Sequence, residues 1–219
     1  MICRSGDLIL CSGRELMSGT INFGISDTFS HLSIAVRMKE GKFLDSSSEE
    51  GDLYFLEFNG SLRYCHYTKK VKSGLTISSF EEMKRMYELI AVCSLKDKIV
   101  TSSNAEKYVK DMIDKPFDSK PINFLSHWLK IDVGRKRGQG FTCVSATDLF
   151  YNQIGIYTPY RIYNPKEFRL LPYFKEAKII YCDKSKASLK FELFFFLLLS
   201  LIIILLFYLM KPRTVATVL

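Results

Sequence analysis

Cys143 has the surroundings that best suit a nucleophile in this sequence. It lies in the run FTCVSATDLFY (141–151), directly after a glycine-broken basic loop at 134–140. Thr142 is a helix-capping residue type, and the apolar residues that follow recur at the spacing of one helix face, so a helix is predicted to begin at Cys143. Backbone N–H groups and the helix dipole stabilise an anion in a first turn, which lowers a thiol pKa. Cys143 is therefore a candidate nucleophile if a base can reach it.

His31 is the candidate base among the three histidines. It begins the alternating run HLSIAVR (31–37), where it shares one face with Ser33 and Ala35, opposite an apolar face. An imidazole close to a thiol can accept its proton and later return it to a leaving group. His66 lies in a polar stretch, and His127, beside a tryptophan, is expected to pack in the interior.

A third polar group is needed to orient the imidazole and to select its tautomer. The returning strand KFLDS (42–46) forms a hairpin with the His31 strand, and its parity places Asp45 on the His31 face. Because a simple turn offsets Asp45 from His31 along the strand, Ser47 and Glu49 remain alternatives. The predicted catalytic set is Cys143, His31 and Asp45.

Charge and cysteine usage limit the other classes of function. The net charge is +8, but Lys and Arg are scattered and no zinc-finger or RNA-binding signature occurs, so nucleic-acid binding is not expected. The six cysteines form no CxxC pair and no zinc spacing with the histidines. We therefore predict free thiols in a reducing compartment, no metal and no cofactor.

The C-terminal sequence predicts a membrane partner. Residues 193–210 carry no charge, and this length meets the requirement for spanning a bilayer. No apolar signal core occurs near the N-terminus, so a single-pass tail anchor is predicted, with the main domain facing the cytosol. The expected organisation is a domain at 1–182, a linker at 183–190, a transmembrane helix at 191–210 and a short tail at 211–219.

The elements that must position these residues read as strands followed by helices. Alternating or β-branched runs predict strands near residues 6–11, 31–37, 42–46 and 87–95, and a hairpin turning at Asn59-Gly60 within 54–67. Helices are predicted after Ser79, over 103–113, at 122–129 and at Cys143, and a last strand over 177–181. This order predicts an α+β domain with an antiparallel sheet and packed helices.

The order of these motifs resembles the circularly permuted NlpC-type papain-like superfamily, in which the histidine strand precedes the catalytic cysteine. That group includes lecithin:retinol acyltransferase-like proteins, bacterial lipoprotein-like hydrolases and poxvirus papain-like proteins. The similarity covers about residues 1–182. The matching pieces are Gly6-Asp7, the strand from His31, Asp45 one strand later, Lys115-Pro116-Phe117-Asp118 and Cys143-Val144-Ser145.

The resemblance implies a permuted papain-like fold and a thiol enzyme. Cys143 would be the nucleophile, His31 the base, and Asp45 the orienting residue, where the family more often has His, Glu, Gln or Asn. The expected function is a membrane-anchored hydrolase or acyltransferase acting on an acyl ester, thioester or amide of a lipid or lipidated protein. The alternatives are a cysteine peptidase or amidase, and an inactive scaffold on a membrane, including a host or virion membrane.

Overall fold

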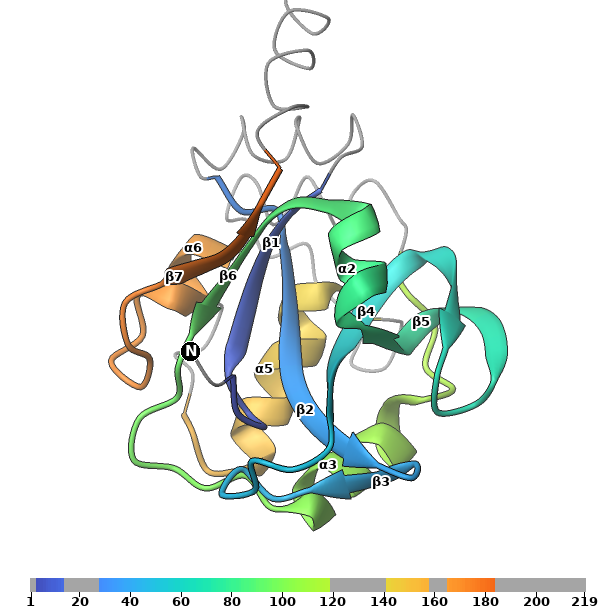
Figure 1. Ribbon diagram of the computed structural model, residues 1–219, viewed down its shortest axis with the longest axis horizontal. Helices are drawn as coiled ribbons and strands as arrows, with labels where there is room; N and C mark the ends of the chain where they lie inside the picture. Colours follow the sequence, from blue (N-terminus) through green and yellow to red (C-terminus); the bar gives the residue numbers. More distant parts are fainter. Residues whose placement is uncertain (1–2, 14–27, 119–140, 158–164, 184–219) are drawn as a thin grey trace, which may run out of the picture. The chain divides into compact units, whose positions relative to one another are not determined.

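A single antiparallel sheet dominates the computed structural model, which describes residues 3–13, 28–118, 141–157 and 165–183 (Figure 1). The spatial order of its strands is β5-β4-β2-β1-β6-β7, and β3 pairs with the C-terminal end of β2. The strands are β1 (Leu8–Gly13), β2 (His31–Lys39), β3 (Lys42–Leu44), β4 (Asp52–Cys65), β5 (Lys70–Ser79), β6 (Tyr87–Cys93) and β7 (Lys178–Cys182).

Two hydrophobic cores lie on opposite faces of the sheet, because alternate residues of each strand point to opposite sides. Leu32, Ile34 and Val36 of β2 belong to the larger core, and Ala35 belongs to the smaller one. The central strands are therefore covered on both faces, which explains why β1 is buried along its whole length.

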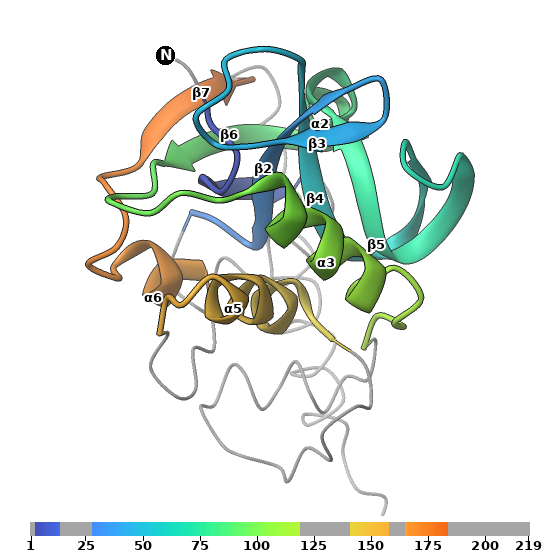
Figure 2. The same ribbon diagram turned by 90° about the horizontal axis from the view of Figure 1, so that it is seen from below.

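The helices divide between these two faces. Figure 2 shows α3 (Ser102–Met112), α5 (Cys143–Gln153) and α6 (Pro165–Arg169) along one side of the sheet, where they contribute to the larger core. Helix α2 (Phe80–Met86) covers the other side and supplies Met83 to the smaller core. The predicted helix at 122–129 lies outside the described residues.

The predicted fold class, α+β with a permuted papain-like arrangement, is wrong. Strands make up 42% of the described structure and helices 25%, so it is mainly a seven-stranded antiparallel sheet with few helices. After α5 the chain adds only the five-residue helix α6 among the described residues, and the strand predicted over 177–181 is β7, which pairs with β6 at the edge of the sheet. No helix in the described ranges is long and apolar enough to cross a membrane; residues 191–210 lie outside them.

The hairpin predicted at Asn59-Gly60 is also wrong. Strand β4 runs through these residues, and the chain reverses between Cys65 and Lys70. Asn59 pairs with Gly74, and its side-chain NH₂ donates to Thr76 Oγ1 at 3.0 Å, so this donor has a partner inside the sheet. An irregularity in the ladder between Asn59 and Arg63 accommodates the turn-forming pair as a local distortion.

Candidate active site

Cys143 is the first residue of α5, as the sequence predicts. Thr142 caps this helix, because its side chain accepts from Ser145 N while Ser145 Oγ accepts from Thr142 N at 2.9 Å. The segment just before the cap is held by a parallel bridge between Phe117 and Phe141. Helix capping and this bridge together fix where the half-buried thiol stands.

His31 is the first residue of β2, so it stands at the end of a central strand. Its ring stacks on the Tyr87 ring, with centroids 5.5 Å apart and planes 14° from parallel. Tyr87 is the first residue of β6, two strands away in the sheet. Stacking against a buried aromatic ring limits the rotation of the imidazole and leaves its two nitrogens to face different partners.

One of these partners is the Cys143 thiol, which hydrogen-bonds with His31. Burial opposes ionisation of Cys143, but the charge and hydrogen bond of His31, with backbone hydrogen bonds from Leu32 and Val144, outweigh it and lower the thiol pKa. Burial likewise lowers the pKa of His31, but Cys143 and Glu57 outweigh this effect and raise it to about 9. The opposite shifts favour a thiolate–imidazolium pair.

Glu57 of β4 is the other partner of His31. Its Oε1 lies 3.4 Å from His31 Nε2, and its side chain is fully buried, whereas 14% of the His31 side chain is exposed. At 3.4 Å the contact is an ion pair that is longer than an ordinary hydrogen bond. Because Nε2 faces Glu57, the other ring nitrogen is the one available to Cys143.

Two further side chains hold the Glu57 carboxylate. The Tyr87 hydroxyl donates to Oε1 at 2.6 Å, and Arg63 Nη1 lies 3.8 Å from Oε2. Burial alone would raise the pKa of Glu57, but His31, Arg63 and the Tyr87 hydroxyl lower it to about 2. Glu57 is therefore an anion throughout the neutral range, and it keeps the imidazole oriented and positively charged.

Asp45 does not lie beside His31. The β2–β3 ladder pairs Arg37 with Leu44, so Asp45 falls opposite Val36, five residues from His31, or about 17 Å along a strand. Its carboxylate accepts from Ser102 N at the start of α3. The alternatives Ser47 and Glu49 are exposed in the loop that follows. Of the predicted set, the structure brings together Cys143 and His31, and it puts Glu57 in the third position.

Sequence reasoning missed Glu57, although a signal for it exists. It is the one charged residue in the apolar run YFLEF (54–58), and a carboxylate in a buried strand requires a partner. Its pairing with Ser33, two residues along β2 from His31, places it on the His31 face, but only the register shows this. The contact of Arg63 with Glu57 could likewise not be predicted from strand alternation, because the β4–β5 ladder is irregular between these two residues.

The other histidines lie elsewhere. His66 Nε2 is 2.9 Å from Glu82 Oε2, and its ring packs against Tyr54 and Tyr64, so it joins the β4–β5 hairpin to α2. His127 is outside the described residues. Within the described ranges, no three His, Cys, Asp or Glu side chains are grouped in a way that could hold a metal ion.

Comparison with known proteins adds no assignment. A scan against protein-family models found no match, and neither did a search of curated proteins. Among solved structures, the chain is similar to the metalloprotein YiiX from Escherichia coli O157:H7, with 12% identity, a TM-score of 0.46, and coverage of 70% of this chain and 67% of that one. A similarity of this extent supports no statement about family or function.

Proposed function

We propose that the protein is a thiol hydrolase or acyltransferase with Cys143 as nucleophile, His31 as base and acid, and Glu57 as the orienting carboxylate. The observation that carries the proposal is the position of His31, which hydrogen-bonds with Cys143 and lies 3.4 Å from the buried Glu57 carboxylate. A scaffold protein has no need for a buried ionic arrangement that lowers the pKa of a half-buried thiol.

The chemistry follows from the protonation states. The Cys143 thiolate attacks the carbonyl carbon of an ester, thioester or amide, and the His31 imidazolium gives its proton to the leaving alcohol, thiol or amine. An acyl group then remains on the sulfur as a thioester. Neutral His31 takes a proton from water or from an acceptor hydroxyl, which attacks the thioester, releases the acyl group and restores the thiolate–imidazolium pair.

The order of these residues supports a relation to the permuted NlpC-type hydrolases, in which histidine, third polar residue and cysteine follow in this order along the chain. Glu57 has a residue type that those proteins use in the third position. The uncharged segment 193–210 is the reason to test lipid-borne acyl groups before peptides. Turnover of peptides alone would favour the peptidase alternative.

A thiol-reactive acyl probe tests the proposal. We expect it to label Cys143, as located by mass spectrometry, and we expect Cys143→Ala and His31→Ala to abolish labelling. Cys182→Ala is the matched control, because Cys182 is an exposed free cysteine away from the site and its loss should leave labelling unchanged. Undiminished labelling in both Cys143→Ala and His31→Ala would overturn the proposal.

A further inference from the structure

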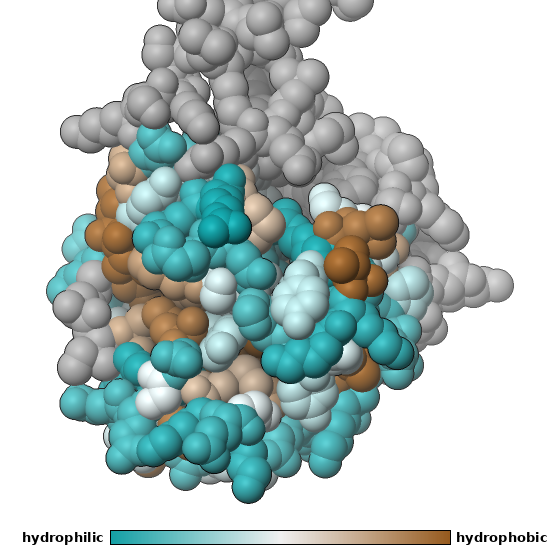
Figure 3. Space-filling model, turned by 45° about the vertical axis from the view of Figure 1, so that its right-hand side comes forward, coloured by the Kyte–Doolittle hydropathy of each residue, from teal (hydrophilic) through white to brown (hydrophobic). Residues whose placement is uncertain are grey.

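The outer end of the β4–β5 hairpin presents an apolar face to solvent. Tyr64 and Val71 are directly opposite each other in the ladder, and Leu62 lies two residues before Tyr64, in the irregular part of β4. Their exposed fractions are 74% for Leu62, 41% for Tyr64 and 64% for Val71. Figure 3 shows hydrophobic side chains gathered on this side of the molecule, where the hairpin projects in Figure 1.

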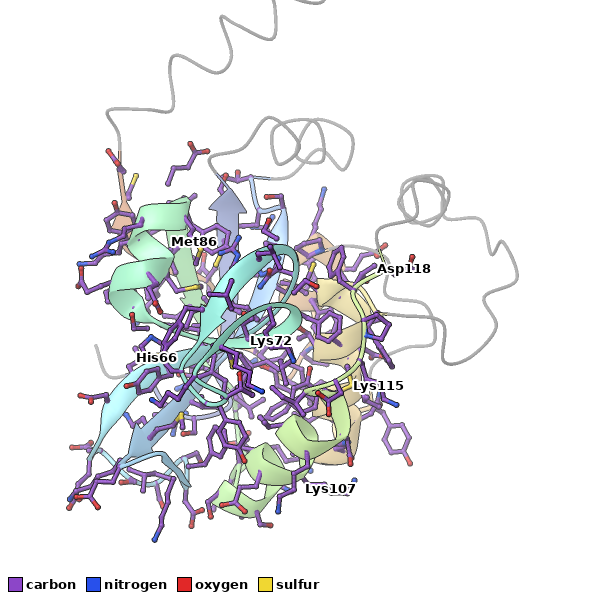
Figure 4. The ribbon with its side chains drawn as sticks, turned by 90° about the vertical axis from the view of Figure 1, so that its right-hand side faces the viewer. His66, Lys72, Met86, Lys107, Lys115 and Asp118 are labelled. Carbon is purple, nitrogen blue, oxygen red and sulfur yellow. The ribbon has the colours of Figure 1, made fainter. Side chains whose placement is uncertain are left out.

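The same hairpin is anchored through its other face, so the apolar face stays outward. Arg63 reaches the Glu57 carboxylate, and Cys65 is fully buried. The Lys72 amine donates to the carbonyl of Ile113. Lys72 lies on β5 and His66 in the turn after β4 (Figure 4), and His66 packs edge-on against Tyr64 with ring centroids 5.1 Å apart. Tyr64 therefore has a defined orientation at the surface.

The charge of the hairpin indicates what this face contacts. From residue 58 to residue 80 the sequence contains Arg63, Lys69, Lys70 and Lys72 and no acidic residue. Lys69 and Lys70 are exposed at the turn, next to Val71. Aromatic and aliphatic side chains beside lysines suit the boundary between headgroups and acyl chains, where the lysines meet anionic headgroups.

We propose that the exposed apolar side chains of Leu62, Tyr64 and Val71, flanked by Lys69 and Lys70 at the turn, dock the protein on an anionic lipid surface. The opposite side of the same strands carries Arg63, which contacts Glu57, so the docked hairpin is linked to the candidate active site through this contact. The docking does not depend on the chemistry at Cys143. Its failure and the failure of the proposed enzyme activity are therefore separable.

Depth-dependent quenching of a single tryptophan tests the docking. The full chain with Trp128→Phe removes its one tryptophan, and Tyr64→Trp then puts a reporter on the hairpin. We expect vesicles of brominated phosphatidylserine to quench this reporter and brominated phosphatidylcholine to quench it far less. The control is Ile99→Trp in the same background, because Ile99 is an exposed apolar residue (70%) that follows a basic residue, as Tyr64 does, but lies in the β6–α3 connection.

Two sets of variants sharpen the result, with circular dichroism to verify the fold. Lys69→Gln with Lys70→Gln should raise the lipid concentration for half-maximal quenching roughly 30-fold, from the attraction of two lysines to an anionic surface. Leu62→Ser with Val71→Ser should abolish quenching at position 64, and Cys143→Ala should leave it unchanged. The proposal would be overturned by equal quenching at positions 64 and 99, or by equal quenching by the two lipids. It would also be overturned if the protein is a dimer that the double substitution Leu62→Ser and Val71→Ser dissociates.

Discussion

His31 is the residue on which the candidate site depends, because it contacts both charged partners. Cys143 and Glu57 each favour the protonated form of the His31 imidazole. Together they raise the pKa of His31 to about 9, although burial lowers it. The same contact lowers the pKa of Cys143. Between these two pKa values the thiolate and the imidazolium coexist, and this is the state that can attack a carbonyl and protonate a leaving group.

The rate of Cys143 labelling should therefore have a bell-shaped dependence on pH. It should rise as the thiol ionises, at a pH below that of an ordinary cysteine, and fall near pH 9 as His31 loses its proton. Glu57→Gln should move the falling limb to lower pH, because the carboxylate helps to raise the pKa of His31. Labelling kinetics from pH 4 to 11, with a probe whose reactivity toward a free thiolate is known at each pH, measure both limbs. A falling limb that Glu57→Gln does not move would contradict this role.

Glu57 and Asp45 can be separated by substitution. We expect Glu57→Gln to lower the labelling rate by about 100-fold, less than the roughly 10⁴-fold loss in a serine triad, because the thiolate is already formed without full help from the carboxylate. Asp45→Asn should leave the rate within about twofold of the unsubstituted protein, because the Asp45 carboxylate accepts a hydrogen bond from Ser102 N at the start of α3, away from His31. The opposite pattern would restore Asp45 as the orienting residue.

The start of α5 is the element that places the nucleophile. The capping residue Thr142 satisfies the N–H of Ser145, and the bridge of Phe117 with Phe141 ties the preceding segment to the chain after α3. Phe58 of β4 packs against both Phe117 and Phe141. The segment before Cys143 therefore packs against β4, the strand that carries Glu57. This packing fixes the position of the thiol relative to the carboxylate.

Two helix caps give a matched pair of substitutions. Thr142→Ala and Thr101→Ala each remove a capping box, at α5 and α3, and each should lower the free energy of unfolding by about 1 kcal/mol in urea titrations. Only Thr142→Ala should also slow labelling, because it loosens the first turn that holds Cys143. Equal labelling rates in the two variants would show that the cap contributes stability alone.

The described part of the molecule is a sheet covered on both faces, and its β4–β5 hairpin packs closely against the chain after α3. Gly74 of β5 has φ +81°, and a Cβ added there would stand 2.5 Å from the carbonyl oxygen of Lys115. The segment after Lys115 leads into the bridge with Phe141. Close packing at Gly74 therefore connects the hairpin to the segment that supports the start of α5.

Gly74→Ala and Gly41→Ala should differ for this reason. Both glycines have positive φ, but an added Cβ at Gly41 meets nothing within 4 Å. Gly41→Ala should lower the free energy of unfolding by about 1–2 kcal/mol from the backbone alone, and Gly74→Ala by about 1–3 kcal/mol more from the clash. Urea unfolding measures both. Gly74→Ala should also slow labelling of Cys143, and equal losses of stability would show that the contact with Lys115 relaxes freely.

Local patterns in the sequence were enough to predict Cys143 at a helix start and His31 at a strand start, because capping and alternation depend on neighbours within a few residues. They wrongly divided β4 in two at Asn59-Gly60, because a turn-forming pair stays within a strand when its partner strand satisfies the backbone. The third residue required the register between β2 and β4, which puts Glu57 rather than Asp45 beside His31. Register is set by long-range packing of two cores, so no local pattern carries it.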